Sequence, residues 1–205
     1  MHGSTPVGEA SPLVAQENVL PFLSACCGIA PTYLSLGNHE LYLTEEDLAL
    51  IADTGVVVLD NEWRAVTADL LIGGLTSGYV MRQRAHLSSH RLTASTERDI
   101  VSTSWLSDFA AQPGFKILLS HHPEYYPLVP SKVNLILSGH AHGGQWRFYD
   151  PFKRIWRGVL APGQGWFPKW TKGVYDGKLV VSAGLSNTTW IPRINNLTEI
   201  VYIEP

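Results

Sequence analysis

The sequence has few cysteines, no long apolar run and no excess of positive charge. Its two cysteines, Cys26 and Cys27, are adjacent, so they cannot form the disulfide framework of a small secreted domain. No apolar run approaches the length of a membrane span, and the polar start lacks the regions of a signal peptide. The formal net charge of -3 leaves no broad basic surface for nucleic acid. These absences favour an ordinary globular protein.

The chain is long and apolar enough to bury a real core. It has 205 residues, of which 45% are hydrophobic and 16% are charged. No repeat, charge block or low-complexity linker divides it, so residues 1–205 are expected to form a single domain. The two cysteines lie in the apolar stretch PFLSACCGIA and are expected to be small buried hydrophobic residues.

Helical and strand patterns alternate along the chain and predict an α/β fold. Helices are expected over 11–28, 43–55 and 95–114. The second has the clearest signals, because Thr44 can cap it, acidic residues fill its first turn and a glycine follows its end. Short apolar strands are expected over residues 32–36, 57–59, 70–75, 115–120, 133–138, 178–184 and 198–205.

Three of these strands run directly into polar motifs. YLSL leads into GNHE, KILLS leads into HHP, and LILS leads into GHAHGG. In open α/β sheets, functional sites gather outside the carboxyl ends of the strands. The three motifs are therefore expected to meet at one place.

The residues in these motifs are suited to binding a metal. Imidazole nitrogen is a good ligand for Zn, Mn and Fe. His140 and His142 are two residues apart, so on an extended backbone they face the same side. Asn38 offers an amide oxygen and His121 a further nitrogen. Taken alone, GNHE or HHP is typical of a turn or a loop, but together and each after a strand they predict a metal site.

The order GNHE, SHHP, GHAHGGQ resembles that of the calcineurin-like metallophosphoesterases. The stretches APGQGWFPKWTKGVY and GLSNTTWIPRINNLTEIVYI resemble the bacterial branch that includes small phosphodiesterases, often attached to or exported across membranes. The resemblance runs from about residue 18 to the end of the chain. It implies a four-layer αββα sandwich and metal-dependent hydrolysis of a small phosphorylated substrate such as a phosphodiester or a pyrophosphate.

The resemblance also implies roles for individual residues. By the family pattern, Asn38, His121 and His140 hold one metal, and His142 belongs to a second. Two such cations polarise the phosphoryl oxygens and lower the pKa of a shared water. His39, next to a ligand, would donate a proton to the leaving group or stabilise its charge.

Several other residues have two readings. Arg193 fits contact with the substrate phosphate or bracing of the C-terminal strand. His122 is expected to face solvent or to pair locally rather than to bind metal, and Glu40 to hold its loop or to begin the next segment. An aromatic group fits packing better than the rim of a substrate cleft. Its members are Trp166, Phe167, Trp170 and Trp190.

The sequence departs from the family pattern at its start. The family has an Asp-x-His on its first strand and a Gly-Asp on its second, and these supply the remaining ligands. No Asp precedes Asp47 here, so we expect a chain that lacks the first strand-helix-strand. Without the bridging carboxylate two cations repel each other, and one metal or none is expected. The open sheet edge is expected to favour self-association.

Two other interpretations stay open. One is a non-catalytic truncated remnant that binds at most one metal. The other is a structural zinc protein, which is disfavoured because structural zinc sites prefer clustered cysteine ligands. The chain as given is typical of a cytoplasmic protein. An upstream targeting segment would make it membrane-associated or exported, and membrane association is expected only through such a segment.

Overall fold

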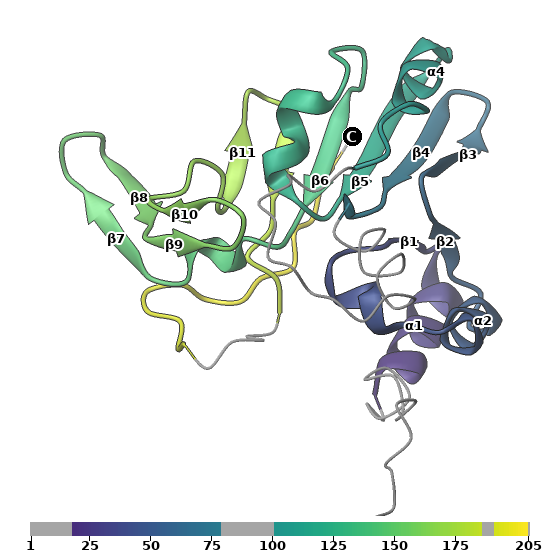
Figure 1. Ribbon diagram of the computed structural model, residues 1–205, viewed down its shortest axis with the longest axis horizontal. Coiled ribbons are helices and arrows are strands. Elements are labelled where there is room, and N and C mark those ends of the chain that lie inside the picture. The colour runs from purple at the N-terminus through teal and green to yellow at the C-terminus, as the bar shows by residue number, and fades with distance from the viewer. Residues whose placement is uncertain (1–17, 79–100, 186–190, 205) are drawn as a thin grey trace, which may run out of the picture.

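The fold is known from a computed structural model, which describes residues 18–78, 101–185 and 191–204. The N-terminal elements are α1 (Val19–Ile29), β1 (Tyr33–Ser35), the 3-10 helix η1 (His39–Tyr42), α2 (Glu45–Asp53) and β2 (Val57–Leu59). The middle of the chain forms β3 (Glu62–Thr67), β4 (Leu70–Leu75), α4 (Leu106–Ala111), β5 (Phe115–Ser120), η2 (Pro123–Leu128), β6 (Leu135–Ser138) and η3 (His142–Gly144). The C-terminal elements are β7 (Arg147–Asp150), β8 (Ile155–Gly158), β9 (Leu160–Ala161), β10 (Gly165–Trp166), β11 (Gly173–Tyr175) and β12 (Leu179–Val181) (Figure 1).

The main sheet has six strands in the order β11-β12-β6-β5-β4-β3. Its inner strands β12, β6, β5 and β4 are parallel, and the edge strands β11 and β3 are antiparallel to their neighbours. Parallel strands end at the same side of a sheet, so the residues after β5 and β6 emerge side by side. The register places Leu119 of β5 opposite Leu137 of β6, just before the two histidine motifs.

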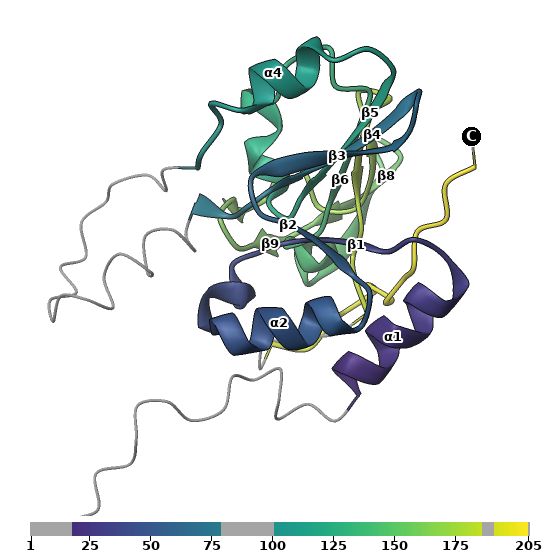
Figure 2. The ribbon, with the colours of Figure 1, turned by 90° about the vertical axis from the view of Figure 1, so that its right-hand side faces the viewer.

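A second, smaller sheet lies under the first. Strands β1 and β2 pair in parallel, and β1 contacts β4 and β5 of the main sheet. Figure 2 shows α4 on one face of the main sheet, β1 and β2 on its other face, and α1 and α2 beyond them. The α/β class and the four-layer αββα arrangement are therefore confirmed.

Two adjacent glycines in β4 allow these layers to approach closely. A Cβ on Gly73 would lie 3.1 Å from the ring of Trp105, next to α4. A Cβ on Gly74 would point to the other face and lie 2.6 Å from the carbonyl oxygen of Leu59 in β2. Successive residues of a strand face opposite sides, so the two glycines of LLIGGL leave both faces of β4 without a side chain at this point.

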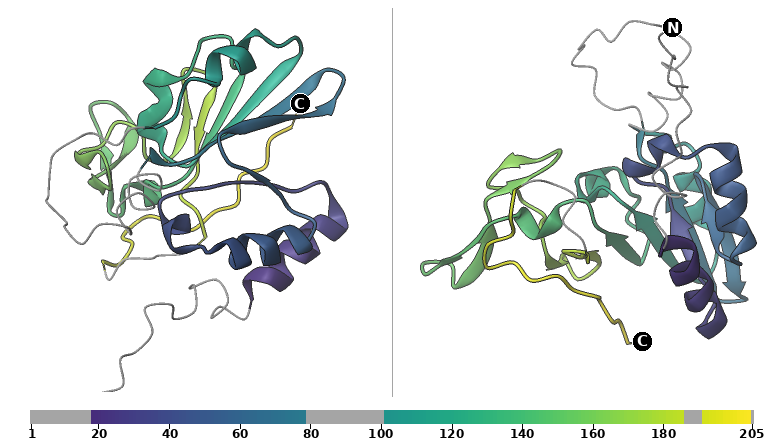
Figure 3. Two further views of the ribbon diagram at one scale, coloured as in Figure 1. Left: turned by 45° about the vertical axis from the view of Figure 1, so that its right-hand side comes forward. Right: turned by 90° about the horizontal axis from the view of Figure 1, so that it is seen from below.

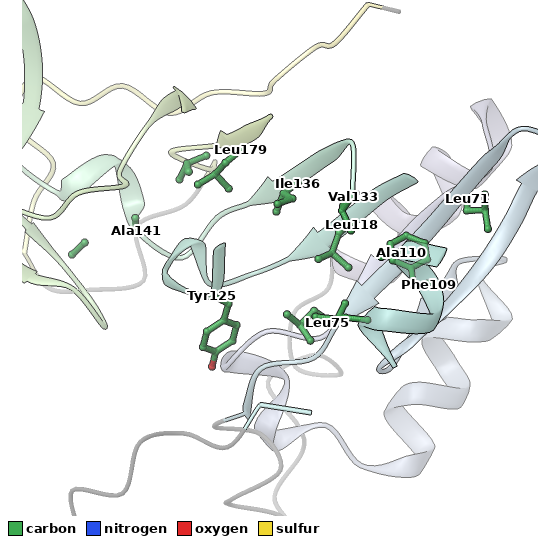
Figure 4. Packing of buried hydrophobic residues seen from close by; sticks show 13 residues of the cluster. Leu71, Leu75, Phe109, Ala110, Leu118, Tyr125, Val133, Ile136, Ala141 and Leu179 are labelled. Atoms are coloured by element: carbon green, nitrogen blue, oxygen red, sulfur yellow. The ribbon is translucent and has the colours of Figure 1, made fainter. Parts of the chain in front are cut away.

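The core fills the space between α4 and the main sheet and continues along the sheet toward the histidine motifs. Figure 4 shows Phe109 of α4 beside Leu71 and Leu75 of β4, with Leu118 and Ile136 following on the next strands. Phe109 is fully buried, and its ring centroid lies 5.7 Å from that of Trp105. Burying a Phe or Leu side chain contributes about 1.5–3 kcal/mol, so this cluster fixes where β5 and β6 end.

The helices agree with the sequence in type but are shorter than expected. Helix α2 has the predicted cap: the Asp47 N–H donates to Thr44 Oγ1 over 3.1 Å, and the Asp47 carboxylate accepts from the Thr44 N–H over 2.8 Å. Helix α1 begins at Val19, and Pro21 fits in its first turn because the first N–H groups have no partner within a helix. Helix α4 covers only 106–111 of the expected 95–114, of which 95–100 lie outside the described residues.

Six of the seven expected strands are present, as β1, β2, β4, β5, β6 and β12, but the short strands β7 to β11 over residues 147–175 were not expected. β3 was not expected, because Glu62–Thr67 carries polar side chains on an edge strand and lacks a clear apolar pattern. The strand expected at the C-terminus is wrong, since residues 197–204 have no regular structure and side chains such as Ile200 and Tyr202 are largely exposed. An apolar run alone could not show that no strand of the described chain pairs with this segment.

Two expectations about burial are also corrected. Cys26 and Cys27 are half-buried rather than buried, because α1 covers the small sheet from outside and buries none of its residues fully. Among the aromatic residues, Trp170 packs against the core as expected, but Trp166 and Phe167 are exposed. Trp190 lies outside the described residues. In the part of the chain that the structure describes, no helix is both long and apolar enough to span a lipid bilayer.

Candidate metal centre

The three motifs meet where β1, β5 and β6 end. Asn38 follows β1, His121 follows β5, and His140 follows β6. The Nδ1 of His140 lies 3.1 Å from Oδ1 of Asn38, and its ring centroid lies 5.1 Å from that of His121. The structure thus brings together the side chains that were expected to hold one metal. The contact also joins the small sheet to the main sheet.

The backbone is strained at the third motif. His140 and His142 have φ angles of 60° and 46°, which are unusual for residues with a side chain. Such strain persists only where the surrounding structure fixes it, and it gathers at functional sites. Here Asn196 fixes it, because its amide donates to the carbonyl oxygens of His142 and Gln145 over 2.6 and 3.1 Å.

The imidazoles at the centre are held in the neutral form. Burial, with the neighbouring His140 and His122 adding to its effect, lowers the pKa of His121 to about 2. Burial likewise lowers the pKa of His140 to about 4, with His122 adding to the effect and Glu124 opposing it. A neutral imidazole keeps a lone pair on one ring nitrogen, which is the form that binds a metal.

The two remaining histidines of the predicted site lie at the edge of this cluster. His39 begins η1, directly after Asn38, and its charge lowers the pKa of both His121 and His140. His142 begins η3, and its charge also lowers the pKa of His121 and His140. Glu40 holds the first loop, because its Oε2 accepts from the Gly37 N–H over 2.6 Å.

Glu124 is the residue that the sequence analysis did not identify. Its Oε1 lies 2.9 Å from Nδ1 of His122 and 3.8 Å from Nε2 of His140. Burial opposes ionisation of this carboxyl, but the hydrogen bond and charge of His122 outweigh it and lower the pKa of Glu124. The spacing His-x-Glu after β5 was the available signal. This spacing is a weak signal, because many loops have it without forming a metal site.

One of the two interpretations of His122 is confirmed and the other is wrong. His122 pairs locally with Glu124, as one reading proposed, but it does not face solvent: only 6% of its surface is exposed. Its Nε2 lies 2.8 Å from the hydroxyl of Ser77, after β4. A ring nitrogen fixed in this way sets which nitrogen of the imidazole carries the proton.

Arg193 approaches the cluster from the C-terminal segment. Its Nη2 donates to the carbonyl oxygen of Ala183 over 2.7 Å and lies 3.5 Å from Nδ1 of His142. Burial lowers the pKa of this guanidinium, against the opposing charge of Glu199. Beside His142 lies a mainly apolar pocket of about 250 Å³. Its lining residues are His142, Gln145, Leu160, Ala161, Pro162 and Ile191.

Residues 7–144 match the family described as calcineurin-like phosphoesterase. The chain belongs to this family. The matched range includes β1, β5, β6 and the three motifs that follow them. No curated protein and no solved structure matches the chain significantly.

Calcineurin-like phosphoesterases usually bind divalent metals, and the residues present here fit a cation. The ligand atoms of His122, Glu124 and His140 all lie within 4.8 Å of one another. Oε2 of Glu124 is buried and has no hydrogen-bond partner among the residues that the structure describes. A cation would satisfy this buried oxygen. Imidazole and carboxylate ligands suit Zn, Mn or Fe.

Proposed function

We propose that this chain hydrolyses phosphoesters in a metal-dependent reaction, with a phosphodiester or a pyrophosphate as the substrate class. The observation that carries the proposal is the meeting of Asn38, His121 and His140 at the ends of strands from both sheets. Each neutral imidazole keeps a lone pair on one ring nitrogen, which a cation can accept. Their clustering is explained when they share a cation.

A bound divalent cation would polarise a phosphoryl oxygen and supply a nucleophilic water near neutral pH. We assign its binding to Asn38, His121 and His140, and we place His142 beside it as the ligand for a second cation. Glu124 contributes the negative charge that the imidazoles and the amide lack. With one carboxylate in the group, two divalent cations would repel each other strongly in a partly buried site. We therefore expect one cation per chain.

The remaining residues bind and orient the substrate. Arg193 carries a positive charge to the side of His142 and is assigned to the substrate phosphate. His39 follows Asn38 in the chain and is assigned to protonating the leaving oxygen. The apolar pocket beside His142 is suited to the carbon skeleton of one ester group.

The test is hydrolysis of bis-p-nitrophenyl phosphate by the purified chain with added Mn²⁺. We expect turnover that requires the metal, and a low rate because one cation does not clamp both the attacking and the leaving oxygen. His39→Ala should lower the rate at least about tenfold and leave bound metal unchanged. The matched control is Gln112→Ala, a half-buried position at the C-cap of α4. Turnover that is the same in His39→Ala, or that needs no metal, would contradict the proposal.

A second candidate function is metal binding without hydrolysis. It is favoured by the small number of carboxylates: among the described residues, Glu124 is the acidic member of the ligand group. The same experiment separates the two functions. Bound metal with no turnover above the rate of free Mn²⁺ would support this second function.

We also propose that two copies of the chain associate through the small sheet. Within the described residues, β1 pairs with β2 alone, so one edge of β1 is open. An open edge presents unpaired backbone groups to which a strand of another chain can pair.

A further inference from the structure

The hairpin formed by β7 and β8 projects from the body of the protein (Figures 1 and 3). Five of its large apolar side chains are exposed. Phe152 at its tip is 97% exposed. The other exposed apolar side chains of the hairpin are Phe148, Tyr149, Ile155 and Trp156. Exposed apolar side chains gathered on one small element in this way indicate an interaction surface.

These side chains lie on both faces of the hairpin. Tyr149 is paired with Trp156, and their rings lie 5.8 Å apart. Because side chains alternate along a strand, Phe148 and Ile155 lie on the opposite face. A protein partner that covers one face would leave the other in water. A fluid layer into which the hairpin enters end-on covers both faces and the tip at once.

The charges of the hairpin indicate which kind of lipid layer it would bind. Lys153 and Arg154 are exposed beside Phe152, and the only acidic residue of the hairpin, Asp150, is paired with Arg157 over 3.5 Å. The hairpin is therefore positive in a chain whose net charge is -3. Basic residues beside exposed aromatic ones are typical of segments that bind anionic lipid.

The tip is also held in a fixed shape. Oδ1 of Asp150 accepts hydrogen bonds from the N–H groups of Phe152 and Lys153, both over 3.1 Å. This turn keeps the Phe152 ring pointing outward with little loss of freedom on binding. A second exposed apolar segment, residues 197–204, has no such features, since its charged residues are Glu199 and Glu204.

We propose that the β7–β8 hairpin docks this protein on the surface of an anionic lipid bilayer. The rings of Phe152, Tyr149 and Trp156 enter the interface, where aromatic residues are favoured. Lys153 and Arg154 meet the anionic headgroups. This contact uses the described chain itself and needs no upstream segment.

Docking at this hairpin also orients the candidate metal centre. Arg147 at the base of β7 donates to the carbonyl oxygen of Gly143 over 2.7 Å, and Gly158 at the end of β8 lies directly against Gly144. The loop that carries His142 is therefore fixed to the base of the hairpin. The docking proposal does not depend on the proposed hydrolysis, because lipid binding is measured without turnover.

The experiment is co-flotation of the full chain with vesicles of phosphatidylcholine and phosphatidylglycerol in equal parts, and with phosphatidylcholine alone. We expect binding to the anionic vesicles. Phe152→Ser should weaken it about tenfold, because the ring no longer enters the interface. Lys153→Glu should weaken it by a similar factor on anionic vesicles and leave binding to neutral vesicles unchanged.

The controls distinguish docking by the hairpin from nonspecific hydrophobic or electrostatic binding to vesicles. Ile200→Ser removes a largely exposed apolar side chain from the acidic C-terminal segment, and Lys132→Glu reverses a charge elsewhere on the surface. Both should bind vesicles like the unchanged chain. Phe152 contacts solvent, so circular dichroism of Phe152→Ser should show an unchanged fold. The proposal is overturned if the unchanged chain does not float with anionic vesicles, or if Ile200→Ser loses as much binding as Phe152→Ser. Loss of a dimer in Phe152→Ser, with no vesicle binding by the unchanged chain, would assign the hairpin to a second copy instead.

Discussion

His140 Nδ1 lies 3.1 Å from Asn38 Oδ1, although 102 residues separate them along the chain. An amide oxygen accepts hydrogen bonds, so Nδ1 of His140 carries the proton. The neutral ring then has its lone pair on Nε2, which faces Oε1 of Glu124 at 3.8 Å. Two lone pairs face each other there. A cation placed between them would remove this repulsion, which supports the proposed metal site.

The first prediction concerns which residues bind the cation. Co²⁺ bound by imidazole has visible absorption bands, so its binding is measured without turnover. His140→Ala should abolish tight Co²⁺ binding, because His140 belongs both to the proposed site of Asn38, His121 and His140 and to the group of His122, Glu124 and His140. Glu124→Gln should weaken it about tenfold or more through loss of the charge. The control is Glu62→Gln, a half-buried position on β3 whose carboxylate pairs with Arg64. If His121→Ala abolishes binding and Glu124→Gln leaves it unchanged, Glu124 is not a ligand, while the cation site of Asn38, His121 and His140 stands.

The second prediction concerns pH and the metal-free protein. The folded-state pKa values of His121 and His140 are about 2 and about 4, below the ordinary 6.5. The unfolded chain therefore binds more protons at acidic pH. Stability is fully present above pH 6.5 and should fall as the pH drops, by up to about 1.4 kcal/mol per pH unit for each imidazole.

Urea unfolding in EDTA at pH 7, 6 and 5 measures this slope. His121→Gln should remove the part of the slope that belongs to one proton. A free energy of unfolding that stays constant over this range would show that neither imidazole is held neutral.

The third prediction tests how closely the two sheets approach. In Gly74→Ala the added Cβ would lie 2.6 Å from the carbonyl oxygen of Leu59, so the layers must move apart. We expect a loss of about 1–3 kcal/mol in the free energy of unfolding. Gly28→Ala is the matched control, since a Cβ there meets nothing within 4 Å and α1 gains helix propensity. Equal stability of the two variants would contradict the packing described.

The fourth prediction concerns the open edge of β1. Val57 N–H donates to the carbonyl oxygen of Thr32 on the β2 side, so the N–H groups of Tyr33 and Ser35 point to the open edge. Light scattering should give a mass that rises with concentration toward twice the 22.6 kDa of one chain. Ser35→Pro should prevent the rise by removing one donor while it spares the β2 ladder. A constant mass equal to one chain would refute association at this edge.

Much of the fold could be predicted because short-range patterns are strong there. Thr44 and Asp47 signal the start of α2, and apolar runs signal β4, β5 and β6. The meeting of His121 and His140 followed from the rule that parallel strands of one sheet end at one side, whereas Asn38 joins them from β1 of the small sheet. The assignment of these residues to metal, of His39 to catalysis and of Arg193 to substrate stays a prediction. The single domain over 1–205 and the lack of a first strand-helix-strand stay predictions as well.

The remaining features of the fold and of the candidate site depend on contacts between distant residues, which sequence patterns do not show. Glu124 and His122 look like ordinary loop residues, and only the position of Ser77 and His140 shows that they are buried. Residues 198–204 contain a run of β-branched and aromatic residues typical of a strand, but the pairing of a strand depends on a neighbour. Phe152 is apolar, and its sequence could not show that a turn at Asp150 holds it outward.

The most direct test of the central claim is a Mn²⁺ titration in which bound metal and the initial rate of bis-p-nitrophenyl phosphate hydrolysis are measured in the same samples. The account predicts that the rate rises in step with the filling of one Mn²⁺ per chain and that both are lost in His140→Ala. Hydrolysis that does not follow Mn²⁺ binding, or two tightly bound Mn²⁺ ions with rapid turnover, would contradict it.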